Sequence, residues 1–250
     1  MKLYNMSVKD IQIKPIDSSR ANKFIKEYHY SGSVVPNSQL HLGAFYHGSL
    51  EGVMQFGPSM DKSKMVGLVE GTGWNEFMEL NRMAFSDKLP QNSGSRCLSI
   101  AFKLFEKHAP HVKWVVSFAD ATQCGDGAMY RASNFVLTGI RENKTILELP
   151  SGQTIADMTL TAHSDTPRPE LGGKTFYEVT DGTGSMKKFM EKTGAEKLQG
   201  YQLRYMYFID KDYRDKLTVP EIPYERIDEL NAGMYKGERV SVAERKPTAE

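Results

Sequence analysis

The stretch Lys113–Phe135, KWVVSFADATQCGDGAMYRASNF, decides the fold. It opens with the apolar run Trp114–Phe118, which predicts a short buried strand because a strand buried on both faces shows a run and not an alternation. A turn of small residues follows and carries Asp120, and a short helix pattern then carries Tyr130. Ligands bind at the carboxyl ends of strands in open α/β sheets. A carboxylate and a phenol at that edge are candidates for an acid, a base or a metal ligand.

The elements expected on either side of this stretch have a mixed order. Alternation and apolar runs predict strands, and apolar positions three or four apart predict helices. Strands are expected over 11–16, 40–46, 52–56, 77–85, 114–118, 135–140 and 201–209, and helices from Ser18 or Ser19, from Arg96, over 128–132 and over 185–193. This order predicts an α/β fold with a mixed, largely antiparallel twisted sheet flanked by helices. Its central strands are expected to be parallel because helices connect them.

Two regions are expected along the chain. Residues 1–210 predict a catalytic domain, and residues 211–250 a C-terminal extension in which charges and prolines dominate. The last dozen residues are expected to form a disordered tail. Residues 58–75 and 162–185 are rich in Gly and polar residues and predict loops, either for contact with DNA or only for the surface.

The composition is that of an ordinary globular protein. Of 250 residues 40% are hydrophobic, enough to bury a core, and the net charge of +1 excludes a polycationic nucleic-acid binder but allows a local basic groove. Cys97 and Cys124 give neither a disulfide framework nor zinc spacing, so a cytoplasmic location is expected. A signal peptide and an apolar run of membrane-span length are both absent from the sequence, so no membrane partner is expected. The oligomeric state stays open.

A second informative stretch is the Gly/Ser loop Pro90–Arg96, which precedes an amphipathic helix pattern. Backbone N–H groups are free at a helix N-terminus and the helix dipole is positive there, so the loop predicts an anion site. Arg82, on the preceding strand, is a candidate for the same anion, for a DNA phosphate or for a plain surface charge. Alternation on that strand puts Glu79 and Asn81 on one face, and Leu80 and Arg82 on the other.

This order of elements, with an anion-type loop before a helix, resembles the GNAT acyltransferase fold. GNAT enzymes hold the pyrophosphate of acyl-CoA on a loop of pattern Q/R-x-x-G-x-G/A, which Gln91–Arg96 matches except for Arg96 at the last, small position. They also carry a tyrosine in a pattern close to Y-x-x-x-G-F, which Tyr130–Phe135 matches with Asn134 in place of glycine. The resemblance implies acetyl-CoA or a related acyl donor as cofactor, held by Gln91, Gly94, Ser95 and Arg96.

A further set of segments covers most of the chain: His29–Gly32, Glu79–Arg82, Asn92–Arg96, Trp114–Asp120, Tyr130–Phe135 and Leu217–Tyr224. Together they resemble the Mom family of phage DNA-modification proteins. The resemblance implies a GNAT relative with bound iron, which adds a carbamoylmethyl (acetamido-type) group to the exocyclic N6 of adenine. This modification would protect phage DNA from host restriction, and the protein would act in the cytoplasm of the host cell.

Residue by residue, the Mom resemblance implies a catalytic and iron-binding set, with cofactor contacts at Arg82 and Ser95; the set is His29, Tyr30, Asp120 and Tyr130. An imidazole with carboxylate and phenolate oxygens suits iron, and the set lacks the thiolates typical of structural zinc. The residues alone also allow a purely structural interpretation, in which His29 and Tyr30 end one helix and Asp120 caps the next helix. Tyr130 can instead be the general acid that protonates a departing thiolate, because a metal-bound phenolate has no proton to donate.

DNA is the partner that the resemblance implies. Adenine N6 lies on the Watson–Crick edge of a paired base, so the enzyme must flip the base out of the duplex or act on single strands. The aromatic candidates to stack on that base are Tyr28, Tyr46, Phe56 and Trp74. Two alternatives stay open: an ordinary GNAT N-acetyltransferase acting on a protein or small-molecule amine, and a GNAT-shaped DNA-binding protein without activity.

Overall fold

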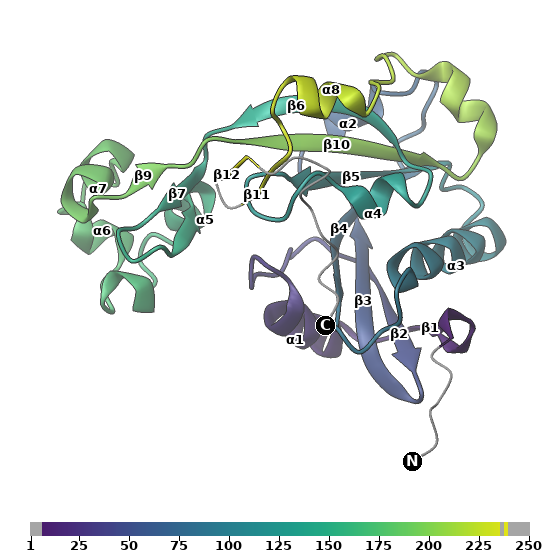
Figure 1. Cartoon of the computed structure of the whole chain (residues 1–250), viewed down its shortest axis with the longest axis horizontal. Helices are drawn as coiled ribbons and strands as arrows, with labels where there is room; N and C mark the ends of the chain where they lie inside the picture. The colour runs from purple at the N-terminus through teal and green to yellow at the C-terminus, as the bar shows by residue number, and fades with distance from the viewer. Residues whose placement is uncertain (1–6, 236–237, 240–250) are drawn as a thin grey trace. The chain divides into compact units, whose positions relative to one another are not determined.

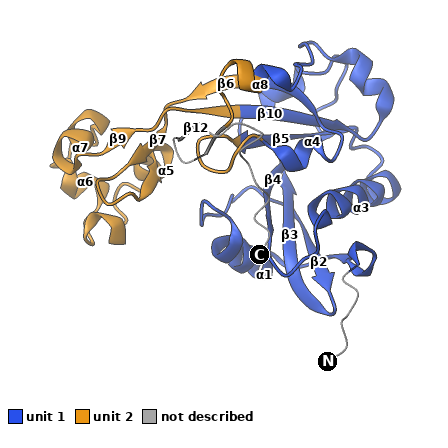
Figure 2. Cartoon of the chain, viewed as in Figure 1, with its two compact units in different colours: residues 1–119, 127–139, 203–226 blue, residues 120–126, 140–202, 227–250 orange. Residues whose placement is uncertain are grey.

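The computed structural model describes residues 7–235 and 238–239 of a chain that forms two compact units (Figure 2). Unit 1 consists of residues 1–119, 127–139 and 203–226, and unit 2 of residues 120–126, 140–202 and 227–250. Residues 211–226 therefore belong to unit 1 together with the N-terminal half, while the functional boundary near residue 210 stays a prediction. Residues 240–250, which hold most of the expected disordered tail, lie outside the described part.

Unit 1 is organised around a seven-stranded sheet of order β1-β2-β3-β4-β5-β10-β6 (Figure 1). The strands are β1 Gln12–Pro15, β2 Leu40–Tyr46, β3 Ser49–Gly57, β4 Phe77–Phe85, β5 Trp114–Asp120, β10 Gly200–Phe208 and β6 Val136–Asn143. Neighbours from β1 to β4 are antiparallel, and β4 and β5 run parallel. The prediction of a mixed, mostly antiparallel sheet flanked by helices is confirmed.

Helices lie on both faces of this sheet. They are α1 Ser18–Tyr28, α2 Lys62–Val66, α3 Ser93–His108 and α4 Ala128–Arg131. Phe24 and Ile25 of α1 pack with Val53 of β3. Phe105 of α3 packs on Phe56 of the same strand, with ring centroids 5.0 Å apart. Val53 and Phe56 are an odd number of positions apart on a strand, so α1 and α3 cover opposite faces (Figure 1).

Two helix starts differ from the expected ones, and one short helix lies in an expected loop. The N-cap of α1 is Asp17, whose carboxylate accepts the Arg20 backbone N–H at 2.8 Å, and not Ser18 or Ser19. A carboxylate there also complements the positive end of the helix dipole. α3 begins at Ser93, directly after Asn92 in the left-handed region (φ 66°), so the second half of the expected loop is the first turn of the helix. Residues 58–75, expected as a loop, contain the short helix α2.

β5 is the buried strand that the sequence predicts. Trp114 is fully buried and stacks on Phe77 of β4, with ring centroids 4.3 Å apart and planes 9° from parallel. Val116 and Met206 belong to the same apolar cluster. Each large apolar side chain buried in this way stabilises the fold by about 1.5–3 kcal/mol. The cluster therefore fixes β5 beside β4.

A β-bulge in β4 changes the faces that its residues occupy. The β3 residues that pair with Leu80 and Arg82 are consecutive, so Asn81 is an extra residue without an opposite partner. Alternation breaks there, and Glu79 and Arg82 lie on the same face, the one covered by α1. The expectation that Glu79 and Arg82 face opposite ways is wrong, because strict alternation assumes a strand without a bulge.

Unit 2 contains a three-stranded sheet of order β8-β7-β9 with short helices around it. Its elements are β7 Ile146–Glu148, β8 Thr154–Ala156, α5 Asp157–Ala162, η2 Pro169–Leu171, α6 Phe176–Val179, α7 Met186–Thr193 and β9 Glu196–Lys197. Leu147, Leu160, Phe176 and Phe189 form its core. α7 is the predicted helix, whereas α6 and η2 lie in 162–185, which is therefore not a plain loop.

The remaining elements are short: η1 Val8–Asp10, η3 Lys211–Lys216, α8 Glu225–Glu229, β11 Met234–Tyr235 and β12 Glu238–Arg239. Within the described ranges, no helix is both long enough and apolar enough to cross a membrane.

Candidate active site where β4 and β5 part

β4 and β5 pair over three residues and then part. The parallel pairing joins Phe77–Glu79 to Trp114–Val116. One residue further along, the Ser117 hydroxyl lies 3.1 Å from the Leu80 carbonyl oxygen, so a side chain replaces the next ladder bond. The bulge at Asn81 bends β4 at the same level. The end of this pairing is the point at which the candidate site residues of unit 1 meet.

Tyr130 of α4 is linked to this point by Ser117. The Ser117 Oγ atom lies 2.9 Å from Tyr130 Oη. Ser117 is fully buried, and its single hydroxyl hydrogen goes to either Leu80 or Tyr130 at one time. Gly127 precedes α4 at φ 76°, and a Cβ atom there would lie 2.5 Å from Tyr205 Cε2. The turn that presents Tyr130 therefore requires glycine.

Arg82 reaches the same point from β4. Its Nε donates to the Ser33 carbonyl at 3.1 Å, and its Nη1 donates to the Asn81 carbonyl at 2.9 Å. Burial lowers the pKa of Arg82, and electrostatic interactions with three side chains partly offset this effect: Tyr30, Glu79 and Tyr130. The guanidinium is thus the fixed positive charge around which the site is arranged.

His29 is a neutral imidazole within electrostatic reach of Arg82. Burial, and secondarily the charge of Arg82, lower the pKa of His29 to about 4. Its Nδ1 accepts the Ser31 backbone N–H at 3.2 Å and lies 2.8 Å from the Ser31 hydroxyl. We therefore assign the proton of the neutral ring to Nε2. Tyr30 packs beside the ring, with centroids 4.3 Å apart.

Glu79 is a site residue that sequence reasoning missed. Burial raises the pKa of Glu79, while the polar groups of Ser59 and Asn81 and the charge of Arg82 lower it in part. Asn81 is itself buried, and its Oδ1 accepts the Ser38 hydroxyl at 3.1 Å. A carboxyl with a raised pKa beside a positive charge is typical of a catalytic acid or base. Sequence analysis identified the segment Glu79–Arg82. Only the bulge at Asn81 places Glu79 and Arg82 on the same face of the sheet.

The predicted anion site lies at the start of α3. Gly94 is in the first turn, and a Cβ atom there would lie 2.5 Å from the Met129 sulfur, so glycine allows α4 to pack on α3. Arg96 Nε is buried without a hydrogen-bond partner among the described residues, which fits an anion-binding role. α3 and Arg82 lie on opposite faces of the sheet. The predicted cofactor contacts therefore form two groups: Arg82 on the α1 face, and Gln91, Gly94, Ser95 and Arg96 at α3.

Asp120 belongs to unit 2, where it shapes the turn after β5. Its carboxylate accepts hydrogen bonds from Thr122 N at 3.0 Å, Gln123 Nε2 at 2.9 Å and Asn143 Nδ2 at 3.4 Å. The alternative that Asp120 caps the next helix is wrong, because the N-cap of α4 is Gly127 and no side chain caps that helix.

The predicted iron ligands are divided between the units: His29, Tyr30 and Tyr130 in unit 1, and Asp120 in unit 2. The chemistry of the unit 1 donors fits iron. If the His29 proton moved to Nδ1, Ser31 Oγ could accept it in a hydrogen bond and Nε2 would be free to bind metal. In the part of the chain that is described, no three His, Cys, Asp or Glu side chains form a group that could hold a metal ion. Iron stays a prediction.

Two of the four aromatic residues expected to stack on a base are unable to do so. Phe56 is fully buried and Tyr46 is 7% exposed, because both point into the core. Tyr28 and Trp74 are 39% and 55% exposed and stay candidates. Aromatic residues on strands give no sequence signal that separates core from surface at a single position.

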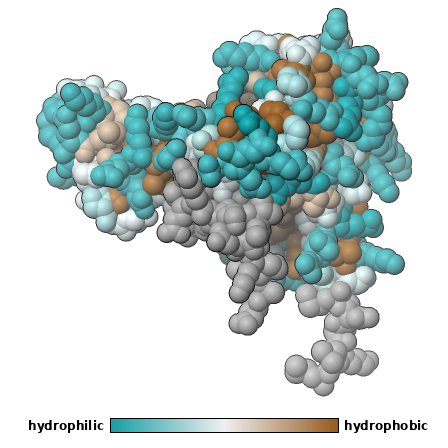
Figure 3. All heavy atoms as spheres, turned by 45° about the horizontal axis from the view of Figure 1, so that its top comes forward, coloured by the Kyte–Doolittle hydropathy of each residue, from teal (hydrophilic) through white to brown (hydrophobic). Residues whose placement is uncertain are grey.

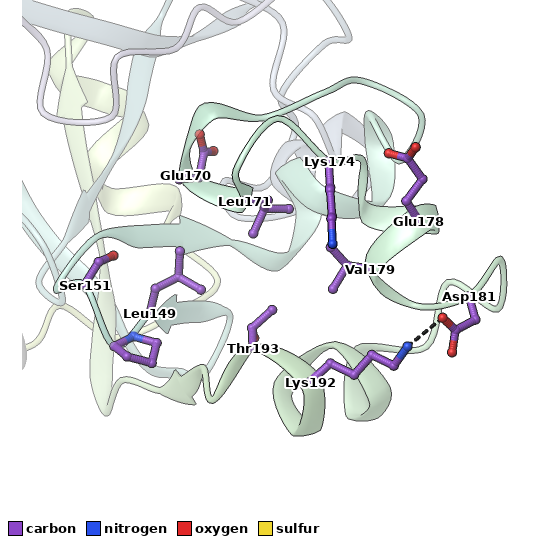
Figure 4. A pocket seen from close by; sticks show the side chains of 11 residues that line it. Leu149, Ser151, Glu170, Leu171, Lys174, Glu178, Val179, Asp181, Lys192 and Thr193 are labelled. Atoms are coloured by element: carbon purple, nitrogen blue, oxygen red, sulfur yellow. Dashed lines mark hydrogen bonds and ion pairs between the residues drawn. The ribbon is translucent and has the colours of Figure 1, made fainter.

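A separate cavity of about 560 Å³ lies in unit 2 (Figure 4). Apolar side chains of Leu149, Leu171 and Val179 line it, and Asp181 on its rim is paired with Lys192 at 2.5 Å. None of the predicted site residues lines this cavity. The candidate active site is therefore the junction of β4 and β5.

Comparison with known proteins places these observations in a family context. A family model described as the Mom protein family matches residues 10–226. The methylcarbamoylase mom of Escherichia phage Mu is 39% identical over 212 residues, which cover 84% of this chain and 80% of the phage protein.

Similar solved structures include an N-acetyltransferase from Staphylococcus aureus Mu50. It has 11% identity and a TM-score of 0.42, over 80% of this chain and 98% of that chain. An IAA acetyltransferase from Bacillus cereus has 13% identity and a TM-score of 0.41, over 79% and 99%. At these scores neither acetyltransferase carries a conclusion about this chain.

Proposed function

The chain belongs to the Mom protein family, and from that premise we propose that it is a transferase acting on the exocyclic N6 of adenine in phage DNA. The group added is carbamoylmethyl (acetamido-type), and it protects the DNA from restriction. One observation carries the proposal: Arg82 interacts electrostatically with both Glu79 and Tyr130 where β4 and β5 part. A proton acceptor, a fixed positive charge and a phenol are the groups that transfer to an amine requires.

Glu79 is the proposed base. Adenine N6 is a weak nucleophile, because its lone pair is delocalised into the ring, and it must lose a proton when it bonds to carbon. The raised pKa of Glu79 makes its carboxylate a stronger base than an exposed one. The charge of Arg82 favours the ionised carboxylate and so opposes part of the effect of burial on the pKa of Glu79.

The proposed group donor is acetyl-CoA or a related acyl compound, with its phosphates at the start of α3. Two observations among the described residues support this placement: the Gly94 and Ser95 N–H groups of the first helical turn have no backbone acceptor, and Arg96 Nε has no partner. An acetyl group contains the two carbons and the oxygen of a carbamoylmethyl group, but not its nitrogen. In a carbamoylmethyl product N6 is bonded to the carbon that was the methyl group of acetyl, whereas acyl transfer bonds N6 to the carbonyl carbon. Direct acyl transfer therefore gives a different product, N6-acetyladenine.

His29, Tyr30 and Tyr130 would hold the proposed iron, together with Asp120 according to the family resemblance. Bound iron would supply redox chemistry at an unactivated carbon, which no side chain provides. In the alternative, an ordinary N-acetyltransferase acting on a protein or small-molecule amine, Tyr130 is the proton donor. The bond between the amine nitrogen and the acyl carbon then forms and the carbon–sulfur bond breaks, the amine proton goes to Glu79, and the Tyr130 proton goes to the departing thiolate.

The test is mass spectrometry of nucleosides from plasmid DNA of cells that express the chain. A carbamoylmethyl adduct on deoxyadenosine is expected, and Glu79→Gln is expected to lower its yield strongly. Fragmentation distinguishes the carbamoylmethyl adduct from an isomeric methylcarbamoyl adduct, the group in the name of the phage Mu relative. A methylcarbamoyl adduct has a urea-type link and releases methyl isocyanate. An acetyl adduct on deoxyadenosine would show direct acyl transfer to N6 in place of the proposed reaction. Unmodified DNA from well-expressed, folded protein would overturn the proposal.

A further inference from the structure

The loop between β3 and β4 begins in the candidate site and leaves it at once. Ser59 is buried, and its polar group acts on the Glu79 carboxyl. The next residue, Met60, is 71% exposed, more than any other large hydrophobic side chain of the described residues. An apolar side chain therefore projects into solvent one residue away from a group that contacts the proposed base.

Met60 projects from a loop that is held at both ends. The Pro58 carbonyl accepts a hydrogen bond from Asn37 Nδ2 at 2.6 Å, which fixes the loop before Met60. After Met60, α2 begins at Lys62, whose Nζ lies 4.9 Å from the centroid of the Trp74 ring. Met60 is thus carried on a short, tethered arm and not at the tip of a long loop.

The surface around this arm suits a nucleic acid. Lys62, two residues after Met60, offers positive charge to phosphates, and the Trp74 ring beside its ammonium group is 55% exposed. α1 leads into Tyr28 and Tyr30, which are 39% and 49% exposed. Hydrophilic residues cover most of the face shown in Figure 3, with smaller hydrophobic areas between them. Met60 is thus an exposed apolar side chain with a cation and an exposed aromatic ring near it, a combination that suits insertion between stacked bases.

We propose that Met60 is a wedge that enters the DNA base stack at the place that the target adenine leaves when it turns into the site. This inference rests on the proposed function and names how a paired adenine reaches it. Turning a base out leaves a gap in the stack, and proteins fill such gaps with apolar side chains, methionine among them. The unbranched thioether is flexible enough to fit between base pairs of different sequence.

The experiment compares Met60→Ala with Met158→Ala, a matched control on a methionine of unit 2 that is 66% exposed. Each protein is given duplex and single-stranded oligonucleotides that contain an adenine modified by the wild type. Met60→Ala is expected to lower modification of the duplex about tenfold, because unstacking is no longer compensated, and to leave the single strand within about twofold. Met158→Ala and Met60→Leu are expected to modify both the duplex and the single strand as well as the wild type does.

A second readout needs no group transfer. With 2-aminopurine in place of the target adenine and no donor present, wild-type protein is expected to raise fluorescence as the base unstacks, and Met60→Ala to raise it much less. Equal duplex activity of Met60→Ala and wild type, or an equal loss on duplex and single strand, would overturn the wedge. A wild type that modifies neither substrate would instead overturn the proposed function, and the wedge with it.

Discussion

Ser117 of β5 and Tyr130 of α4 are linked by a hydrogen bond of 2.9 Å. The Leu80 carbonyl, 3.1 Å from the same serine oxygen, is a second acceptor for the serine hydrogen. When Ser117 donates to that carbonyl, its oxygen can accept the phenol hydrogen of Tyr130. When Ser117 instead donates to Tyr130, the phenol hydrogen is available to a substrate and the serine hydrogen bond stabilises the phenolate that remains. The link gives Tyr130 a chemical role that a plain core tyrosine lacks.

Tyr130→Phe is expected to lower the yield of modified adenine by at least about 100-fold, because the variant lacks the oxygen that would bind iron or, in the alternative, donate a proton. The free energy of unfolding should fall by only about 1 kcal/mol, because one hydrogen bond is lost and the ring stays packed. Nucleoside mass spectrometry at equal protein levels and thermal denaturation measure the two effects.

Tyr213→Phe is the control for that substitution. Tyr213 also lies in unit 1, and its hydroxyl donates to Glu76 at 3.2 Å, so the variant loses one hydrogen bond away from the site. It should keep its activity. Similar activity losses in both variants would mean that stability, and not chemistry, explains the effect of Tyr130→Phe.

Glu79 predicts the pH dependence of the reaction. A base must be ionised to accept a proton, and burial raises the pKa of Glu79, so the rate should rise with pH through that raised pKa. Glu79→Gln should remove this rise and lower the rate about 100-fold or more on its plateau. Glu106→Gln, on the exposed side of α3, is a control that should keep the wild-type profile. An unchanged profile in Glu79→Gln would exclude Glu79 as the base.

The same carboxyl predicts a pH-dependent change in stability. Because the folded-state pKa of Glu79 lies above the unfolded one, its protonated form stabilises the fold at low pH, and this contribution is lost as pH rises through the folded pKa. Glutamine never ionises. The Tm of Glu79→Gln relative to wild type should therefore increase with pH above the ordinary glutamate value and then level off. A constant difference between pH 4 and pH 8 would contradict the raised pKa.

Local pattern was sufficient for most of unit 1. The apolar run Trp114–Phe118 predicted the buried strand β5, and the alternating segment 77–85 predicted the strand β4. The N-cap of α1 was misplaced because Asp17, Ser18 and Ser19 are consecutive and each is able to cap a helix.

The site depended on features that no local pattern contains. The bulge at Asn81 arises from the register between β3 and β4, and it alone brings Glu79 to the face of Arg82. The pairing of β4 and β5 likewise ends through a serine side chain that joins two distant elements. One backbone feature could be predicted locally. The sequence places Asn134 where the related pattern has glycine, and Asn134 has a φ of 62°, in the left-handed region that glycine and asparagine tolerate.

Gly94 predicts a packing effect distinct from the chemistry. A Cβ atom at Gly94 would lie 2.5 Å from the Met129 sulfur, so Gly94→Ala should destabilise unit 1 by about 1–3 kcal/mol. Adding Met129→Ala should restore part of that loss, because the thioether is the group that is crowded. Denaturant unfolding measures the stability of the single and the double variant. Equal stabilities would show that crowding against Met129 does not cause the destabilisation.

Iron content gives a prediction that needs no activity. Protein purified without a metal-chelating resin is expected to contain iron, and His29→Ala should lower that content strongly, because an imidazole nitrogen would be lost from the donor set. His111→Ala, at an exposed position, should leave the iron content unchanged.

Asp120→Asn tests whether Asp120 also binds the iron. In the wild type the Asp120 carboxylate accepts the Thr122 N–H at 3.0 Å; the asparagine amide oxygen can still accept this hydrogen bond, but the negative charge is lost. Low iron content with an unchanged Tm would assign Asp120 to the metal. Normal iron content would limit Asp120 to the turn that it holds, and iron-free wild-type protein that stays active in chelator would remove iron from the reaction.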